Sequence, residues 1–318
     1  MSGATDDVPG PQVVPVAGAP ADVTVYEVGA RDGLQNEATL VPVAVKAELV
    51  RRLVAAGLPA VELTSFVHPG RVPQLADAEQ LMARLGPLPV RAPVLVPNLR
   101  GLDRALGAGA REVAVFLSAT ETFSQRNLGG SRQQAMAAAR QVCTTALDAG
   151  VAVRGYVSMC FGDPWEGDVD VDAVARSVGE LLAAGVTEVS LGDTIGVATT
   201  GQVTGLLAAL AAADVPVDAL AVHFHDTYGQ ALANTLEALR HGVRTVDASA
   251  GGLGGCPFAR SATGNLATED LVWALHGMGV STGVDLPSLV ETSVWLSGHL
   301  GRPSPSRVVR ALAGGGPA

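Results

Sequence analysis

The chain has 318 residues, of which 48% are hydrophobic, and a formal net charge of −10 at pH 7. This length suits one large α/β domain or two small ones, and an acidic chain without a basic run is poorly suited to bind nucleic acid or an anionic membrane. No apolar run reaches the length of a transmembrane helix, and the three cysteines show no CxxC spacing, which indicates a reducing compartment.

Both ends of the chain have the composition of flexible tails. Residues 1–22 are rich in Pro, Gly and Ala, and they lack both a secretory signal and the arginines of a transit peptide. Residues 301–318 end in RALAGGGPA, which carries no peroxisomal signal. We therefore expect one folded domain over residues 23–300, between a disordered and a flexible tail.

Within residues 23–300, short strand patterns alternate with helical patterns. The predicted strands cover residues 23–28, 60–63, 90–96, 112–117, 151–157, 188–191, 220–225 and 245–248. The predicted helices cover residues 43–56, 74–85, 99–106, 131–149, 171–184, 200–213, 230–241, 266–276 and 286–300. Several of these helices stop at a glycine, the residue that most easily adopts the positive φ of a helix end.

Eight strand–helix units followed by one more helix predict parallel strands joined by right-handed crossovers. The fold expected is a (β/α)₈ TIM barrel with an additional C-terminal helix. A doubly wound open sheet is the main alternative, and the absence of G-x-G-x-x-G after the first strand weakens it.

Ionisable side chains gather where the predicted strands end. They are Arg31 and Asp32 after the first strand, Glu62 in the second, Asp193 after the sixth, and His223 and His225 in the seventh. The carboxyl ends of barrel strands form one rim, where the active sites of such enzymes lie. We therefore expect these side chains to share a cavity.

The pair His223 and His225 in HFHD projects from one face of its strand, because side chains two apart point the same way. Two such imidazoles are either satisfied core histidines or metal ligands. Together with the carboxylate of Asp32 they would suit a hard divalent ion with open coordination positions. Asp32 could instead be a turn residue, since RDG is a good turn by itself.

Three further residues can be interpreted in chemical or in structural terms. Arg31, beside a candidate ligand, could bind an oxyanion or a developing enolate, or it could form a salt bridge with Glu62. Asn265 could be the N-cap of the last barrel helix. Cys256 lies in the glycine-rich GGLGGCPFA, which is typical of a lid that closes over substrate and not of a buried structural thiol.

Five segments together resemble 3-hydroxy-3-methylglutaryl-CoA lyases, members of a superfamily of metal-dependent barrel lyases. The segments are VGARDGLQNE, VELTSFVHPGRVPQLAD, SLGDTIGVAT, HFHDTYGQALANTL and GGLGGCPFARSATGNLATEDLVWALHGMG. The likeness runs over residues 23–300. The loop around Cys256 is its most specific part, because the related synthases are not expected to carry it, whereas RDG and H-x-H mark only the superfamily.

The resemblance implies a role for most of these residues. It implies that Mg²⁺ or Mn²⁺ is bound by Asp32, His223, His225 and Asn265, that Arg31 lies at the thioester carbonyl, and that Cys256 is required for turnover. Glu62 and Asp193 match important acidic positions of the family and are candidates for the catalytic base or for supporting roles, and Cys256 is a candidate to protonate the enolate carbon or to relay that proton. Asn127 follows the fourth strand and could contact coenzyme A, or it could simply form a loop turn.

The resemblance also implies a reaction, an acyl-CoA substrate and an assembly. The expected reaction is the cleavage of 3-hydroxy-3-methylglutaryl-CoA to acetoacetate and acetyl-CoA by a homodimer. The lack of a transit peptide and of a peroxisomal signal fits an enzyme of the cytoplasm. Leucine degradation and ketone-body formation are the pathways associated with this reaction, and the sequence does not decide which pathway the chain serves. A longer branched substrate such as 3-hydroxy-3-isohexenylglutaryl-CoA is one alternative. The others are an acyl-CoA condensing synthase of the same superfamily and a non-catalytic sensor of metal or CoA.

Overall fold

The computed structural model of the protein describes residues 10–255 and 264–313. Its strands pair in parallel in the order β2-β1-β9-β8-β7-β6-β5-β4-β3. The strands are β1 (Thr24–Glu27), β2 (Ala60–Val61), β3 (Thr64–Ser65), β4 (Val94–Leu95), β5 (Glu112–Ser118), β6 (Ala152–Ser158), β7 (Glu188–Asp193), β8 (Leu220–Phe224) and β9 (Thr245–Ala248).

The sheet closes on itself through the segment that contains β2 and β3. These two short strands are the two ends of the sheet order, yet only two residues separate them in the chain. The amide of Glu62 donates to Glu27 O of β1 on one side (2.8 Å), and the amide of Leu63 donates to Pro93 O next to β4 on the other side (2.9 Å). The segment from β2 to β3 therefore forms a single strand of the barrel between β1 and β4. The nine labelled strands thus make eight positions, and the predicted eight-stranded barrel is confirmed.

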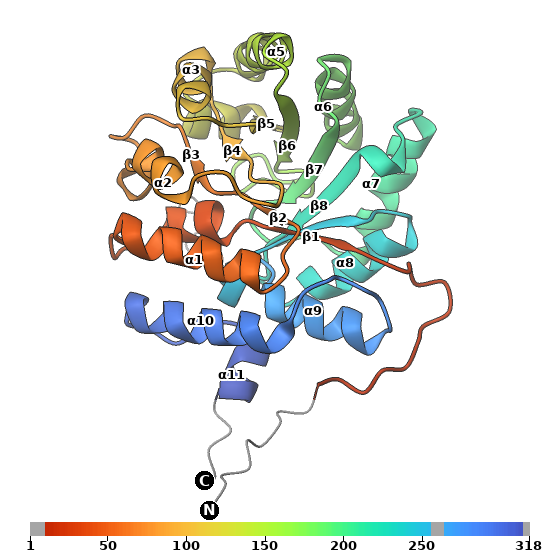
Figure 1. Cartoon of the computed structure of the whole chain (residues 1–318). Coiled ribbons are helices and arrows are strands. Elements are labelled where there is room, and N and C mark those ends of the chain that lie inside the picture. The colour runs from red at the N-terminus through yellow and green to blue at the C-terminus, as the bar shows by residue number, and fades with distance from the viewer. Residues whose placement is uncertain (1–9, 256–263, 314–318) are drawn as a thin grey trace, which may run out of the picture.

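Helices surround the barrel, as Figure 1 shows. They are α1 (Val43–Ala55), α2 (Ala78–Leu85), α3 (Leu99–Gly107), α4 (Glu121–Phe123), α5 (Arg132–Asp148), α6 (Val171–Ala183), α7 (Thr200–Ala212), α8 (Ala231–Arg240), α9 (Thr268–Gly277), α10 (Leu286–Leu300) and α11 (Arg307–Ala313). The helix α10, predicted as an addition to the barrel, packs against α1 and α9.

Two predicted elements are shorter than their sequence patterns suggest. The strand expected over 90–96 is reduced to β4, because Pro93 has no amide to donate to a neighbouring strand. The helix expected over 74–85 is divided into a 3₁₀ turn, Pro73–Leu75, and α2, which starts only at Ala78.

The chain ends are more ordered than predicted where the structure describes them. Part of the expected flexible tail 301–318 forms α11, and Val309 of this helix is buried. Val14 and Val16, in the expected disordered tail, donate hydrogen bonds to carbonyls of Gly277 and Met278 at the end of α9. The pattern missed α11 because RVVRALA spans only two helical turns, which is too short for a convincing apolar periodicity.

The strand faces explain why the barrel interior is polar. In β8, Val222 and Phe224 point to the apolar layer beneath the helices, while His223 between them points inward. Arg154 in β6 and Asp247 in β9 lie between apolar residues in the same way and are fully buried. The alternation therefore directs an ionic set of side chains into the barrel.

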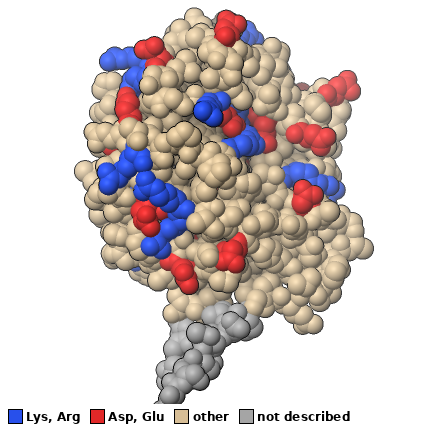
Figure 2. All heavy atoms as spheres, in the orientation of Figure 1, with Lys and Arg blue, Asp and Glu red and all other residues tan. Residues whose placement is uncertain are grey.

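The outer surface is mixed in charge. On the face drawn in Figure 2, basic and acidic side chains lie close to one another instead of separating by sign. No helix within the described residues is both long enough and apolar enough to cross a membrane.

Candidate active site at the carboxyl ends of the strands

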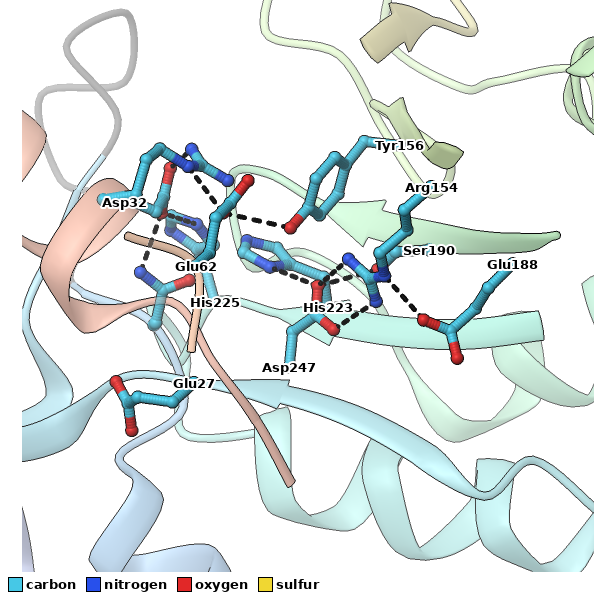
Figure 3. Close-up of polar contacts among 12 residues, drawn as sticks. Glu27, Asp32, Glu62, Arg154, Tyr156, Glu188, Ser190, His223, His225 and Asp247 are labelled. Carbon is cyan, nitrogen blue, oxygen red and sulfur yellow. Dashed lines mark hydrogen bonds and ion pairs between the residues drawn. The ribbon is translucent and has the colours of Figure 1, made fainter. Parts of the chain in front are cut away.

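Asp32, His223 and His225 meet at one point. Asp32 belongs to a π-helical turn, Gly29–Gly33, directly after β1, whereas His223 lies in β8 and His225 follows its end. One potential ligand atom from each residue lies within 4.8 Å of the others, and Figure 3 shows the three side chains gathered together. The placement of these residues at predicted strand ends indicated this meeting, although they are almost 200 positions apart in the sequence.

Asn265 completes the group around Asp32. Its Nδ2 donates to Asp32 Oδ2 (2.9 Å) and to Leu253 O (3.0 Å). Its Oδ1 is buried and has no hydrogen-bond partner among residues 10–255 and 264–313. The alternative interpretation of Asn265 as a helix N-cap is wrong, because Ala267 occupies that position of α9. A buried, unpartnered amide oxygen beside a carboxylate and two imidazoles is suited to bind a cation.

Arg31 is fixed by two carboxylates. Its Nε donates to Glu62 Oε2 (2.7 Å) and its Nη1 to Asp32 Oδ1 (2.6 Å). The salt bridge to Glu62, considered as an alternative to a chemical role, is therefore present, and it holds the guanidinium at the site. Tyr156, whose hydroxyl donates to Glu62 Oε2 (3.1 Å), packs beside Arg31.

The charges at the site determine the ionisation of Asp32. Burial acts to raise its pKa, but the guanidinium of Arg31, followed by His223 and His225, lowers it to about 2. Asp32 is thus a carboxylate at neutral pH, the form that binds a cation.

A cavity of about 930 Å³ extends from this point. Arg31, Asp32, Tyr156, His223 and His225 lie on its wall. Elsewhere the cavity is lined by a more basic group, which consists of His68, Arg71 and Arg126, and by the neutral amide of Asn127. Its volume is in the range of sites that enclose a sizeable organic ligand.

Asn127 lies on this cavity wall in a π-helical turn, Ser124–Leu128, that ends at Gly129 with a φ of 78°. Both interpretations of this residue, as a loop turn and as a group able to contact a ligand, are therefore compatible with its position.

Asp193 stabilises the loop after β7. Its Oδ1 accepts the amide of Val197 (2.9 Å) and its Oδ2 that of Ala198 (3.0 Å). Burial raises its pKa to about 6, although these hydrogen bonds oppose the shift. Its neighbours Gly192 and Thr194 line the cavity, but Asp193 is not among the described residues that do. Both of its oxygens are thus committed to the protein backbone.

Cys256 lies outside the described residues, as does the rest of the segment 256–263. The chain just before it is closely fitted to the site, because a Cβ on Gly254, whose φ is 118°, would clash with Nδ2 of Asn265. Gly255 lies on the cavity wall. The glycines that precede the cysteine therefore allow the backbone to pass directly beside Asp32 and Asn265.

A buried ionic group that was not predicted from the sequence lies beneath the site. Arg154 donates to Asp247 Oδ1 (2.6 Å) and to Glu188 Oε1 (2.7 Å). Its guanidinium lies over the rings of Tyr26 and Tyr156, at 3.8 and 4.7 Å from their centroids. A single charged residue inside each of the apolar strands VAVRGYVS and TVDA was the available signal.

Two further buried acids were also missed. Glu27 accepts the amides of Gly29 (2.7 Å) and Ala250 (2.8 Å) and the hydroxyl of Thr268. Glu269 accepts the amide of Gly251 and a short hydrogen bond from the hydroxyl of Ser293. Together these acids fix the turn at residues 250–252, from which the chain continues to Cys256.

The sequence of the whole barrel matches a known protein family. Residues 22–295 match the HMGL-like family. The chain belongs to the HMGL-like family. A chicken relative named mitochondrial hydroxymethylglutaryl-CoA lyase is 48% identical over 293 residues, which are 92% of this chain and 98% of that protein. An Arabidopsis thaliana relative of the same name is 53% identical over 93% of this chain, and the match spans 63% of its length.

Solved structures of HMGL-like proteins have the same fold. The hydroxymethylglutaryl-CoA lyase of Pseudomonas aeruginosa is 46% identical, with a TM-score of 0.91 over 94% of this chain and 100% of that one. An HMG-CoA lyase of Acinetobacter baumannii, solved with coenzyme A and 3-methylmalate, is 34% identical, with a TM-score of 0.88 over 94% and 97% of the two chains. Divalent-metal dependence is a property of this family.

Proposed function

We propose that this chain is a divalent-metal-dependent lyase that cleaves 3-hydroxy-3-methylglutaryl-CoA to acetoacetate and acetyl-CoA. The observation that carries the proposal is the meeting of Asp32, His223 and His225 on the wall of one large cavity, beside Arg31. Relatives named for this lyase match nearly the whole chain. One similar structure was solved with coenzyme A and a small hydroxy diacid, 3-methylmalate.

The donor set fits Mg²⁺ or Mn²⁺, which accept carboxylate and amide oxygens in open sites. Asp32, His223 and His225 would hold the ion, and the unpartnered Oδ1 of Asn265 supports this residue as a further ligand. When bound, such an ion supplies Lewis acidity that lowers the pKa of a substrate hydroxyl.

Arg31 stabilises the charge that develops on the substrate. Cleavage of the carbon–carbon bond leaves acetyl-CoA as an enolate, whose negative charge lies mostly on the thioester oxygen. Glu62 and Asp32 fix the guanidinium before substrate arrives, so it can hold that oxygen without reorganising. In this assignment Tyr156 supports the arginine by packing beside it and by donating to Glu62.

The proton steps involve groups with different access to the cavity. Neither Glu62 nor Asp193 is among the described residues that line it, which favours positioning roles for both: Glu62 for Arg31, and Asp193 for the loop after β7. Cleavage transfers one proton from the substrate hydroxyl to the enolate carbon, and Cys256, which follows Gly255 of the cavity wall in the sequence, is the proposed group that delivers this proton.

The basic part of the cavity suits the coenzyme A portion of the substrate. The diphosphate and the 3′-phosphate of coenzyme A are anionic, and Arg71 and Arg126 supply two permanently charged guanidinium groups there. Asn127 offers an amide that can hydrogen bond to the pantetheine amides or to the phosphates.

An assay of acetyl-CoA release from 3-hydroxy-3-methylglutaryl-CoA, with Mg²⁺, with Mn²⁺ and with a chelator, tests the proposal. We expect release that the chelator abolishes and that either ion restores, and loss of this release in His225→Ala. Cleavage that persists at the same rate in the chelator, or in His225→Ala, would contradict the metal-site assignment.

The same assay separates the alternatives. A higher kcat/KM on 3-hydroxy-3-isohexenylglutaryl-CoA would indicate a longer natural substrate, which the apolar wall residues Leu95, Val115 and Phe116 could accommodate. Net condensation of acetyl-CoA with a keto acid would indicate a synthase. The cytoplasmic location and the homodimer stay predictions, since relatives are named for both the mitochondrion and the cytoplasm.

A further inference from the structure

A buried chain of charged groups connects the barrel interior to His223. The strand register places Arg154 of β6 beside Glu188 of β7, and Asp247 of β9 beside His223 of β8. Arg154 and Asp247 bridge the remaining gap across the barrel interior, and all four side chains lie in line in Figure 3. Only His223 of these four lines the cavity. The other three therefore contact no ligand of that cavity directly.

Asp247 is held in one orientation. Its Oδ1 accepts Arg154 Nη2 (2.6 Å), and its Oδ2 accepts Arg154 Nη1 (3.2 Å) and the hydroxyl of Ser190 (2.9 Å). The guanidinium itself cannot turn, because it lies between two tyrosine rings and also binds Glu188. The position of Oδ2 is thereby fixed by donors from two other strands.

Asp247 Oδ2 lies 3.3 Å from Nδ1 of His223. This contact is longer than the hydrogen bonds to Asp247, and Nδ1 is a buried atom without a hydrogen-bond partner among the described residues. Asp247 is thus the acceptor available to this nitrogen. A carboxylate at Nδ1 favours the imidazole tautomer that carries its proton on Nδ1 and leaves the lone pair on Nε2 for a ligand.

We propose that Asp247, held by Arg154, is a positioning residue that fixes the tautomer and the orientation of His223 for binding a divalent cation together with Asp32 and His225. The proposal rests on the metal site of the proposed function. Asp247 and Arg154 then do more than stabilise the fold, because the carboxylate that balances the charge of Arg154 also orients the metal ligand His223.

The substitution Asp247→Asn tests this assignment. The asparagine oxygen must face Arg154 Nη2, since its amide group there would meet another donor at 2.6 Å. The new NH₂ then lies in the place of Oδ2, where it donates to His223 Nδ1 and forces the proton to Nε2. We expect the affinity for Mn²⁺, measured by electron paramagnetic resonance or calorimetry, to fall by about 10- to 100-fold.

Glu188→Gln is the matched control. Glu188 binds the same guanidinium through Arg154 Nε but does not contact His223. This variant weakens the same buried group, so its melting temperature can fall, yet its affinity for Mn²⁺ should stay within about twofold of the wild type. An equal loss of Mn²⁺ affinity in both variants would show that Asp247 acts only through stability, and would overturn the proposal.

The tautomer of His223 gives a readout that stability does not affect. In ¹⁵N-histidine-labelled wild-type protein, with the signal assigned by comparison with His223→Asn, we expect the proton on Nδ1, and in Asp247→Asn on Nε2. A proton on Nε2 in the wild type would overturn the proposal even if Asp247→Asn does not fold. Failure of the proposed function has a different signature: the wild type would then show no saturable Mn²⁺ binding, or binding that His225→Ala leaves unchanged.

Discussion

Two groups of carboxylates lie in the barrel, and they have partners of different kinds. Asp32 and Asp247 each contact an arginine, at 2.6 Å in both cases. Glu27 and Glu269 are fully buried, whereas the side chain of Asp32 is 17% exposed. Glu27 and Glu269 accept hydrogen bonds only from hydroxyls and backbone amides among the described residues. We refer to these as the arginine-paired acids and the hydroxyl-paired acids.

The pKa values of the two groups diverge for this reason. In all four acids burial acts to raise the pKa. The arginines outweigh burial in the first group, so the pKa of Asp32 falls to about 2 and that of Asp247 falls below its usual value. In the second group burial dominates, and the pKa rises to about 7 for Glu27 and to about 8 for Glu269. Burial alone therefore does not determine charge: in these four acids the partner decides, whereas burial still raises the pKa of Glu62 although Arg31 contacts it.

The largest expected effect comes from removing the arginine at the catalytic end. Arg31→Met takes away the group that holds the enolate oxygen, and we expect kcat to fall by about 10²- to 10⁴-fold. Acetyl-CoA release under saturating Mg²⁺ and substrate measures this change.

Arg31→Lys is the control for that variant. Lysine keeps the positive charge next to Asp32 but cannot donate to Asp32 and Glu62 in the fixed fork of a guanidinium. It should therefore recover only part of the lost rate. A kcat for Arg31→Met within about threefold of the wild type would remove Arg31 from the mechanism.

The second largest effect is expected on the free energy of unfolding, when the buried arginine is removed. Arg154→Met leaves Asp247 buried without a cation, and we expect the free energy of unfolding to fall by about 3–5 kcal/mol. Denaturation in urea measures it. Adding Asp247→Asn in the same chain should restore part of the loss, because the uncompensated charge is then gone.

An exposed pair provides the comparison for Arg154. Arg176 contacts Asp170 at 3.4 Å, and both side chains are more than 60% exposed. Arg176→Met should change the free energy of unfolding by less than about 1 kcal/mol. Similar losses for Arg154→Met and Arg176→Met would mean that burial of the pair adds nothing.

The sequence predicted the barrel and the meeting of Asp32, His223 and His225 because both follow from local rules. Strand and helix periodicity gives the eight repeats, and parallel strands must bring their carboxyl ends to one rim. The partner of a buried charge follows from no local rule. Arg154 and Asp247 are 93 residues apart, and only closure of the barrel brings them into contact.

Local sequence rules also do not show which acidic residue at the strand ends faces the cavity. Asp193 stands at a strand end like Asp32, and the sequence does not distinguish them. The loop after β7 returns two amides to Asp193, whereas Asp32 faces the cavity. The direction of a few loop amides therefore separates a residue that supports the backbone from one that can bind a ligand.

The hydroxyl-paired acids provide the most specific test, with the smallest effect per pH unit. Because the pKa of Glu269 is about 8 in the folded protein and about 4.5 in the unfolded chain, the folded protein retains a proton over that interval that the unfolded chain has released. Stability must then fall as the pH rises from 5 to 8, by up to about 1.4 kcal/mol per pH unit for each such proton. Glu269→Gln imitates the protonated acid and should remove this contribution, so the slope of unfolding free energy against pH becomes less negative.

Asp285→Asn serves as the control for Glu269→Gln, because the pKa of Asp285 is shifted in the opposite direction. Hydrogen bonds from Ser288 lower it, so any stability linked to its proton changes only below about pH 4. Urea unfolding at several pH values between 5 and 8 should therefore give the wild-type slope for Asp285→Asn and a shallower slope for Glu269→Gln. If Glu269→Gln keeps the wild-type slope, Glu269 is ionised across this range, and the contrast between the two groups of acids does not hold.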